Sequence, residues 1–280
     1  MRDLTNKVVL VTGAASGIGR AAAIAFAREA AGPVAITDIN EKGLQETAEM
    51  LKNLDAEAIV WPTDVTDFVT INEMVEDIIA RCGRIDILVN VAGISLICPA
   101  ENLEIEDWKK VVDVDLWGVI NTVTAVYPHM VKRQSGHIVN VSSTDGLFCP
   151  GLYYSAPYCA AKGGVVGLSD DLLYEAMLHN IGVTVVCPGA VDTPIFDTTP
   201  VKGLRPEIKE LADYIAPTKE KPEDTASAIV QAVKKNKYLV VTTLEMKVMY
   251  FLRRHFPFLW YALMKLVTKV LDRVMDKYRI

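Results

Sequence analysis

Residues 7–19 read Lys-Val-Val-Leu-Val-Thr-Gly-Ala-Ala-Ser-Gly-Ile-Gly, a short apolar run that leads into three closely spaced glycines. The run predicts a strand over residues 7–12, and the pattern over residues 17–31 predicts a helix. Glycines let such a turn approach a pyrophosphate closely, and the helix N-terminus offers free N–H groups to the anion. We therefore expect a dinucleotide phosphate to bind at this turn. The predicted contacts are Gly13, Ser16, Gly17, Ile18 and Gly19.

The next predicted strand ends at an acid. Asp38 lies nineteen residues past Gly19, close to the spacing at which a carboxylate bonds the ribose 2′-hydroxyl of a dinucleotide. A carboxylate there repels a 2′-phosphate, so NAD is favoured over NADP, and we expect Ile39 to belong to the same site. The alternative role for Asp38 is to cap the helix predicted over residues 41–53.

The alternation of strands and helices continues along the chain. Further strands are predicted over residues 56–61, 85–89, 137–141, 183–187 and 238–243. This pattern predicts an α/β fold of the Rossmann type, a doubly wound parallel sheet of about seven strands with helices on both faces. Ligands of such sheets bind at the carboxyl ends of the strands, where Asp64 and Asn90 join Gly13 and Asp38.

Tyr158 and Lys162 form a candidate catalytic pair. They lie four residues apart on the helix predicted over residues 157–179, and therefore on one face of it. An ammonium beside a phenol lowers the phenol pKa from its ordinary value of about 10, which makes Tyr158 a candidate general acid or base. Asp115 is expected near the centre of a long helix over residues 104–133, where a buried acid needs a partner such as Lys162.

Composition limits the class of protein. A net charge of −6 on 280 residues argues against a nucleic-acid binder. The five scattered cysteines predict reduced thiols rather than disulfides, and the spacing of the four histidines predicts no metal site. The N-terminus does not resemble a signal peptide, and the longest apolar run is too short to span a bilayer. We therefore expect a cytoplasmic protein.

Residues 246–280 are predicted to form a basic amphipathic helical tail after a nucleotide-binding domain over residues 1–245. The tail holds eight Lys or Arg and two Asp, a net charge of +6, which leaves −12 for the rest of the chain. Its apolar stripe runs from Leu259 to Tyr278 at helical spacing. Two interpretations remain open, because the stripe can pack on the body or a neighbouring subunit, or lie in a membrane interface as a peripheral contact.

Together these motifs resemble the short-chain dehydrogenase/reductase family in its basic single-domain form, over roughly residues 5–245. The matching pieces are Thr12 to Gly19, Asp38, Asp64-Val65, Asn90 to Gly93, Ser143, Tyr158 to Lys162 and Pro188 to Thr193. The resemblance implies that Tyr158 exchanges a proton with the substrate oxygen, which Ser143 holds, while Lys162 bonds the nicotinamide ribose. It also implies a homodimer or homotetramer assembled through the helices over residues 104–133 and 157–179.

The resemblance implies further cofactor contacts around the sheet. The residues concerned are Asp64, Val65, Asn90, Ala92, Gly93, Tyr158, Pro188, Gly189, Val191 and Thr193. Two features depart from the family pattern. Asp115 stands where the family usually has asparagine, so its role is either catalytic or structural. Ser143 lies fifteen residues before Tyr158 instead of the usual thirteen, which leaves Ser142 as the alternative.

These observations predict an NAD(H)-dependent oxidoreductase that transfers hydride between the nicotinamide and a hydrophobic secondary alcohol or ketone. The predicted pocket residues are Leu147, Phe148, Leu152, Tyr153, Tyr154, Ile195 and Phe196. One alternative is an NADPH-dependent reductase of the 3-oxoacyl type, which Asp38 opposes. Others are a non-catalytic dinucleotide-binding regulatory protein, which has no need of a proton donor, and a membrane-peripheral scaffold.

Overall fold

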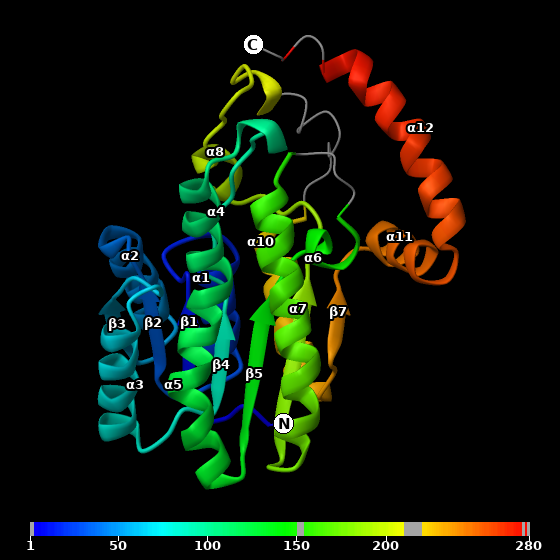
Figure 1. Cartoon of the computed structure of the whole chain (residues 1–280). Helices are drawn as coiled ribbons and strands as arrows, with labels where there is room; N and C mark the ends of the chain where they lie inside the picture. The colour runs from blue at the N-terminus through cyan, green and yellow to red at the C-terminus, as the bar shows by residue number, and fades with distance from the viewer. Residues whose placement is uncertain (1–2, 150–153, 210–219, 276–277, 279–280) are drawn as a thin grey trace.

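A parallel sheet forms the centre of the protein (Figure 1). The computed structural model describes residues 3–149, 154–209, 220–275 and 278. The strands are β1 (Val9–Thr12), β2 (Val34–Asp38), β3 (Ala58–Pro62), β4 (Ile87–Asn90), β5 (Gly136–Val141), β6 (Ile181–Cys187) and β7 (Leu239–Val241). Their order in the sheet is β3-β2-β1-β4-β5-β6-β7, and all pairings are parallel. The order reverses between β1 and β4, which is where such sheets bind their ligands.

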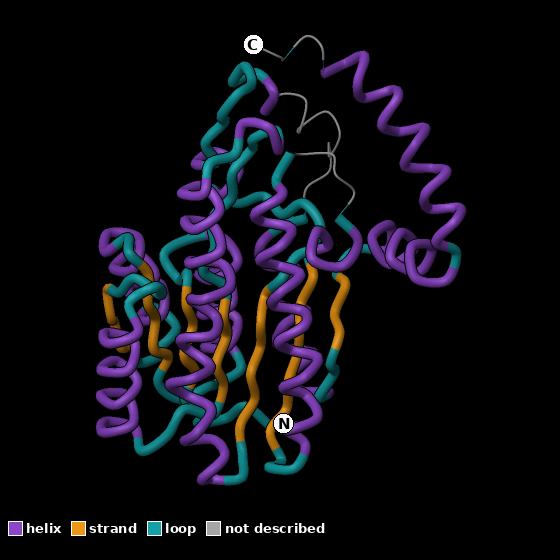
Figure 2. The backbone as a smooth tube through the Cα atoms, in the orientation of Figure 1, coloured by secondary structure: helices purple, strands orange, loops and turns teal. Residues whose placement is uncertain are grey.

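Helices cover both faces of the sheet, so the predicted doubly wound fold is confirmed (Figure 2). The helices of this layer structure are α1 (Gly17–Arg28), α2 (Glu41–Lys52), α3 (Phe68–Cys82), α4 (Ile105–Val112), α5 (Gly118–Arg133), α6 (Thr144–Phe148), α7 (Ala156–Met177), α8 (Ile195–Thr198) and α10 (Pro222–Lys235). A short 3-10 turn, η1 (Ala100–Asn102), precedes α4. Two helices follow the sheet, α11 (Leu244–His255) and α12 (Pro257–Met275).

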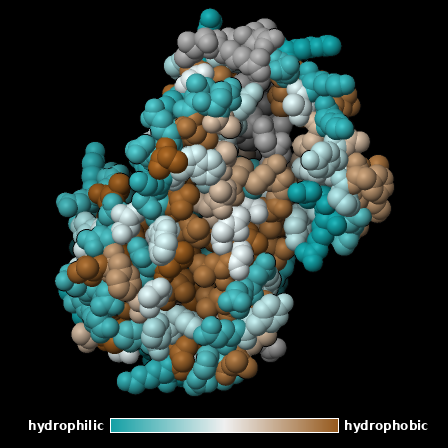
Figure 3. Space-filling view, viewed as in Figure 1, coloured by the Kyte–Doolittle hydropathy of each residue, from teal (hydrophilic) through white to brown (hydrophobic). Residues whose placement is uncertain are grey.

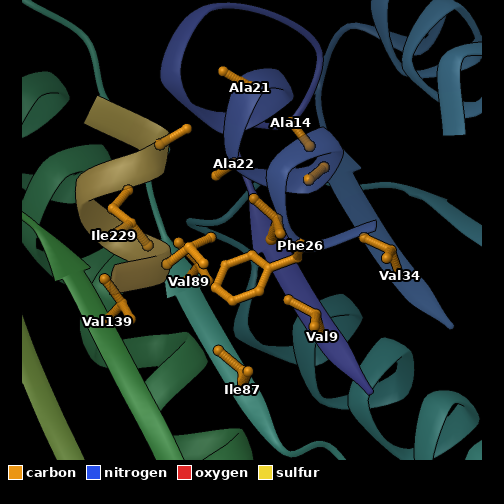
Figure 4. Close-up of a cluster of buried hydrophobic side chains, with 14 of the residues drawn as sticks. Val9, Ala14, Ala21, Ala22, Phe26, Val34, Ile87, Val89, Val139 and Ile229 are labelled. Carbon is orange, nitrogen blue, oxygen red and sulfur yellow. The ribbon is translucent and has the colours of Figure 1, made fainter. Parts of the chain in front are cut away.

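The two faces of the sheet carry separate cores. Phe26 of α1 is fully buried among apolar side chains of the central strands and of α10, including Val89 and Ile229 (Figure 4). On the other face, Met74 of α3 and Val165 of α7 are fully buried against the same strands. Burial of each such side chain contributes about 1.5–3 kcal/mol, which fixes the helices that carry the loops at the carboxyl edge.

The helix predicted over residues 104–133 is not regular. A π-helical turn, η2 (Asp113–Trp117), joins α4 to α5. A π turn inserts an extra residue into a helix, and such turns often lie at functional sites. Within this turn Asp115 is completely buried, whereas Asp113 and Trp117 are exposed.

Helix α12 buries only part of its apolar stripe. Trp260 is buried, and Val267 and Leu271 are half-buried on the same side of the helix. Leu266 and Val270, which belong to the predicted stripe, are 62% and 58% exposed. The stripe is therefore wider than the face that packs on the body. Among the described residues, no helix is both long and apolar enough to cross a bilayer.

Candidate active site

The glycine turn after β1 makes a cradle that larger residues would fill. Gly13 and Gly17 have φ of +66° and +50°, values that favour glycine. A Cβ on Gly19 would lie 2.1 Å from the carbonyl oxygen of Gly13, so the turn closes onto α1 only without a side chain. The Ser16 side chain makes no capping hydrogen bond to α1, whose N-terminus faces this turn. A pyrophosphate fits the donors and the space of this cradle.

Asp38 lies against the glycine turn. Its carboxylate accepts hydrogen bonds from the N–H of Ala15 at 3.1 Å and of Asn40 at 3.0 Å. The cap of α2 is Asn40, whose side chain accepts from the N–H of Gly43 at 3.0 Å, so the capping alternative for Asp38 is wrong. Ile39 is 73% exposed beside it.

The Arg20 cation lies near Asp38, but it already has an acidic partner. The Arg20 guanidinium pairs with Glu46 at 2.8 Å and donates to the carbonyl oxygens of Ala15 and Gly43. Its charge is therefore balanced within α1 and α2.

The loop after β3 carries Asp64 and Val65. Asp64 is exposed, and its carboxylate accepts from the N–H and the hydroxyl of Thr66, both at 2.9 Å. Val65 is buried, and its carbonyl oxygen accepts from the Asn121 amide at 2.9 Å. This contact between Asn121 and Val65 could not be predicted from the sequence, because the side chain of an asparagine inside a helix usually points to solvent.

Thr12, the last residue of β1, connects the glycine turn to the turn after β4. The Thr12 hydroxyl oxygen accepts from the N–H of Val91 at 3.0 Å and of Ala92 at 3.2 Å, a role the sequence analysis missed. Asn90 lies here as predicted, but its side chain is used inside the protein. It donates to Asn140 at 2.9 Å and accepts from Thr122 at 2.7 Å. Both polar groups of the Asn90 side chain therefore bond neighbouring elements of the protein.

Ser143, Tyr158 and Lys162 converge at the carboxyl end of β5. The Ser143 side chain lies near the Tyr158 phenol, whose pKa it acts to lower. The Lys162 ammonium lies 5.6 Å from the centre of the Tyr158 ring and donates to the carbonyl oxygen of Val141 at 3.3 Å. Ser142 is turned away, because its hydroxyl donates to the carbonyl oxygen of Lys162 at 2.8 Å. This geometry favours Ser143 over Ser142 as the substrate-binding hydroxyl.

Asp115 reaches the same point from η2. Its Oδ2 lies 3.2 Å from Lys162 Nζ, and its Oδ1 accepts from the N–H of Ile94 at 2.8 Å. The side chains of Asp115 and Lys162 are 0% and 4% exposed, so the predicted partnership is confirmed as a buried ion pair. A Cβ on Gly93 would lie 3.1 Å from that carboxylate and 3.2 Å from the ammonium, which explains the glycine there.

The prediction that the pKa of Tyr158 is lowered is wrong for this structure. Burial of the phenol raises its pKa, and the charges of Asp115 and Asp145 raise it further, against a smaller lowering by the Ser143 hydrogen bond. Asp145 of α6, which the sequence analysis missed, has its own pKa raised by burial to about 6. The sequence analysis counted the charge of Lys162 but not the two carboxylates brought beside Tyr158 by η2 and α6.

The segment after β6 contacts the glycine turn. A Cβ on Gly17 would lie 2.9 Å from the side chain of Thr193, so the two loops are in contact. The carbonyl oxygen of Pro188 accepts from the N–H of Thr144, next to Ser143, at 2.9 Å. Val191 is buried, and Gly189 faces Met246 at the start of α11.

The predicted pocket residues separate into groups. Phe148 is buried edge-on against Trp260 of α12, with ring centres 5.5 Å apart. Tyr154 packs with the Ile97 and Leu204 cluster, whereas Leu147 packs toward the sheet with Val185 and therefore points away from the predicted pocket. Ile195 and Phe196 begin α8 and are half-buried. Leu152 and Tyr153 lie outside the described residues.

Comparison with known proteins identifies the family. The model of the short chain dehydrogenase family matches residues 7–202. The chain belongs to the short-chain dehydrogenase family. It is 38% identical over 230 residues to the 3-oxoacyl-[acyl-carrier-protein] reductase FabG of Thermotoga maritima, covering 81% of this chain and 90% of that protein.

Two further similar proteins differ from that reductase in their named activity or bound ligand. The chain is 35% identical over 199 residues to the (2S)-[(R)-hydroxy(phenyl)methyl]succinyl-CoA dehydrogenase subunit BbsD of Thauera aromatica, covering 71% of this chain and 79% of that subunit. A short-chain dehydrogenase/reductase from Burkholderia phymatum, solved in complex with NAD, matches with a TM-score of 0.82 and 26% identity, covering 91% and 95% of the two chains. Its family makes the present protein an NAD(P)-binding oxidoreductase.

Proposed function

We propose that this short-chain dehydrogenase is an NAD(H)-dependent oxidoreductase that acts on a hydrophobic secondary alcohol or ketone. The observation that carries the proposal is the meeting of Ser143, Tyr158 and Lys162 at the edge of the sheet that also carries the glycine cradle. A nicotinamide cofactor, when bound, supplies or accepts the hydride. The residues of the chain then need only hold the substrate oxygen and move one proton.

Tyr158 and Ser143 are suited to those two tasks. Hydride addition to a ketone builds negative charge on oxygen, which a positioned hydroxyl stabilises and an acid then protonates. In the proposed mechanism Ser143 donates a hydrogen bond to that oxygen, and Tyr158 gives up its phenolic proton. Oxidation of the alcohol reverses both steps. Lys162, held by Asp115, is proposed to bond the nicotinamide ribose.

NAD is the proposed cofactor because of the charges around β2. The carboxylate of Asp38 lies at the end of β2 against the glycine turn, and the charge of nearby Arg20 is balanced by Glu46. A 2′-phosphate would therefore meet the carboxylate of Asp38. The remaining proposed contacts are Asp64, Val65, Ala92, Gly93, Pro188, Gly189, Val191 and Thr193, with Asn90 acting through its backbone.

The proposed substrate is hydrophobic because apolar side chains surround the proposed proton donor. Leu96, Cys98 and Val111 pack with Tyr158. The test is turnover at 340 nm with NADH and a panel of cyclic and long-chain ketones. We expect reduction of apolar ketones and no reduction of sugars. Absence of any hydride transfer with either nicotinamide cofactor would contradict the proposal.

A second candidate is reduction of a 3-oxoacyl thioester. It is favoured by the 38% identity to a protein named 3-oxoacyl-[acyl-carrier-protein] reductase. Inclusion of a 3-oxoacyl thioester in the same panel, with NADPH and with NADH, separates the two candidates. Faster reduction of the thioester with NADPH would favour this second function.

Assembly as a homodimer or homotetramer is also proposed. Trp117 of η2 and Tyr174 and Met177 of α7 are 53%, 71% and 60% exposed. Figure 3 shows apolar residues gathered on the middle of the face along which α5 and α7 run in Figure 1. Contact between copies through these helices would bury that surface. A monomer in light scattering would contradict this assembly.

The tail over residues 246–280 is proposed as a second unit that contacts an anionic membrane surface. Leu266 and Val270 are exposed beside Lys265 and Lys269 on α12. A dimer formed through two copies of this face would bring lysines close to lysines, which repel each other. Anionic lipids carry the opposite charge and would attract them. The body, with its charge of −12, would be repelled by the same lipids, so the tail alone would face them.

This contact predicts a specific charge dependence. We expect the full chain to sediment with vesicles of phosphatidylglycerol and phosphatidylcholine. The double change Lys265→Glu and Lys269→Glu should weaken the binding by about tenfold or more. The control is Lys42→Glu with Lys52→Glu on α2, which makes the same charge change at exposed positions of the body. Equal binding of both variants and the unchanged protein would contradict membrane contact.

A further inference from the structure

Two cysteines lie together where α6 packs against α7. Cys149 follows the last residue of α6, and Cys159 lies in the first turn of α7. The two helices are in close contact, because a Cβ on Gly146 of α6 would lie 2.6 Å from the carbonyl oxygen of Lys162 in α7. The thiols of Cys149 and Cys159 lie near each other, and each is the largest influence on the pKa of the other. Neither thiol takes part in the proposed proton transfer.

Each thiol also has one polar contact of its own. The Cys149 thiol donates to the carbonyl oxygen of Asp145, one helical turn earlier. The Cys159 sulfur lies 4.0 Å from the hydroxyl oxygen of Ser155. Thiols are weak donors and acceptors, so these contacts hold the two sulfurs only loosely. All five cysteines are free thiols, and the structure therefore shows the reduced form of this pair.

The two cysteines differ in reactivity. Cys149 is exposed, and the Cys159 side chain lowers the pKa of its thiol, helped by the charge of Arg253 and opposed by partial burial and by the charge of Asp145. Cys159 is half-buried, and Cys149 and burial raise the pKa of its thiol. Because the thiolate is the nucleophilic form, Cys149 is the cysteine that reacts first with an oxidant. An exposed cysteine of low pKa beside a second cysteine is typical of redox sensors.

We propose that Cys149 and Cys159 form a reversible disulfide when the protein meets a hydroperoxide, and that this bond inhibits the oxidoreductase. This inference rests on the proposed function, because it concerns the regulation of the same site. Cys149 is the residue that the peroxide oxidises, and Cys159 is the residue that completes the bond. Intracellular disulfides of this kind are transient and respond to the redox state of the cell.

The disulfide forms in two balanced steps. The Cys149 thiolate attacks one oxygen of hydrogen peroxide, the O–O bond breaks, and Cys149 sulfenic acid and hydroxide are formed. The Cys159 sulfur then attacks the Cys149 sulfur, and the hydroxyl of the sulfenic acid leaves with the Cys159 proton as water. The two sulfurs lose the electrons that the peroxide oxygens gain. A dithiol reductant restores both thiols by thiol–disulfide exchange.

The cross-link would connect the two helices that carry Ser143 and Tyr158. Ser143 is the N-cap of α6, and Tyr158 directly precedes Cys159 in α7. Disulfides have a specific geometry, so formation of the bond moves the two cysteines away from the positions of the free thiols. Because a displacement of about 1 Å can cost about 10²-fold in rate, we expect the cross-linked protein to reduce a ketone at least about tenfold more slowly.

Treatment of the full chain with a few equivalents of hydrogen peroxide tests the inference. Trypsin leaves both cysteines on one peptide, residues 134–162, because no Lys or Arg lies between these ends. Without reductant we expect this peptide to lose one hydrogen from each of its two thiols. Ketone reduction should fall in parallel and should return after treatment with dithiothreitol. A peptide that keeps both thiols, or a cross-linked protein with full activity, would overturn the inference.

Cys149→Ser removes the sulfur that attacks the peroxide. We expect this variant to keep its activity after the same treatment. The matched control is Cys82→Ser, at a half-buried position at the end of α3, which should remain as sensitive to peroxide as the unchanged protein. Equal inhibition of Cys149→Ser and the unchanged protein would overturn the inference while leaving the proposed function intact. Absence of hydride transfer in the untreated protein would instead overturn the proposed function, and the mass of the peptide would still report the disulfide.

Discussion

Replacement of Tyr158 by phenylalanine is expected to lower kcat by about 10²- to 10⁴-fold, the range that general acid–base catalysis supplies. The change removes one hydroxyl and leaves the ring, so the packing of Tyr158 against Leu96 and Val111 is kept. Cofactor affinity should change little, because the glycine cradle lies on β1 and α1. The measurement is steady-state turnover together with cofactor titration.

The matched control for this variant is Tyr174→Phe, which makes the same change at an exposed position of the same helix, α7. Its kcat should equal that of the unchanged protein. If Tyr158→Phe retained more than about a tenth of the activity, Tyr158 could not be the main proton donor. Asp145, whose pKa is raised to about 6, would then become the candidate.

Replacement of Lys162 by methionine is expected to lower the free energy of unfolding by about 3–5 kcal/mol, because it leaves Asp115 buried without its partner. Burial already raises the pKa of Asp115, with Lys162 as the largest opposing influence. Without Lys162 the folded-state pKa rises further above the unfolded value. The stability of the variant therefore falls as pH rises, and its deficit should be larger at pH 8 than at pH 5.

Urea unfolding at both pH values measures this effect. Adding Asp115→Asn to Lys162→Met should recover part of the lost stability, since the amide carries no charge to be buried. Lys132→Met, at an exposed position of α5, is the control and should change the stability by less than about 0.5 kcal/mol. A loss below about 1 kcal/mol for Lys162→Met at pH 8 would contradict a tightly buried pair.

Much of the fold could be predicted because its signals are local. Apolar β-branched runs and helical periodicity place the seven strands and the helices between them to within a few residues, as in β5 and α7. Glycines such as Gly13 indicate a tight turn, because they adopt a positive φ that other residues avoid. Even the Asp115–Lys162 contact could be anticipated, because a buried acid expected near the centre of a long helix needs a partner.

The parts that could not be predicted depend on contacts distant in sequence. Asp145 and Asp115 come from separate elements, and only the packed structure brings their charges to Tyr158 and reverses the expected direction of its pKa. The π turn likewise has no periodicity of its own in the sequence. The apolar stripe of α12 can be recognised in the sequence. Which side of it packs on the body cannot, because this depends on the contact between Trp260 and Phe148.

The most direct test of the central claim is calorimetric titration with NADH and NADPH, which needs no knowledge of the substrate. We predict that the unchanged protein prefers NADH. In Asp38→Ala the NADH affinity should fall by about tenfold or more, since a hydrogen bond to a charged group is lost, while NADPH affinity should rise. Glu57→Ala, at an exposed acid just before β3, should change neither affinity. A preference of the unchanged protein for NADPH, or unaltered NADH binding in Asp38→Ala, would contradict the account.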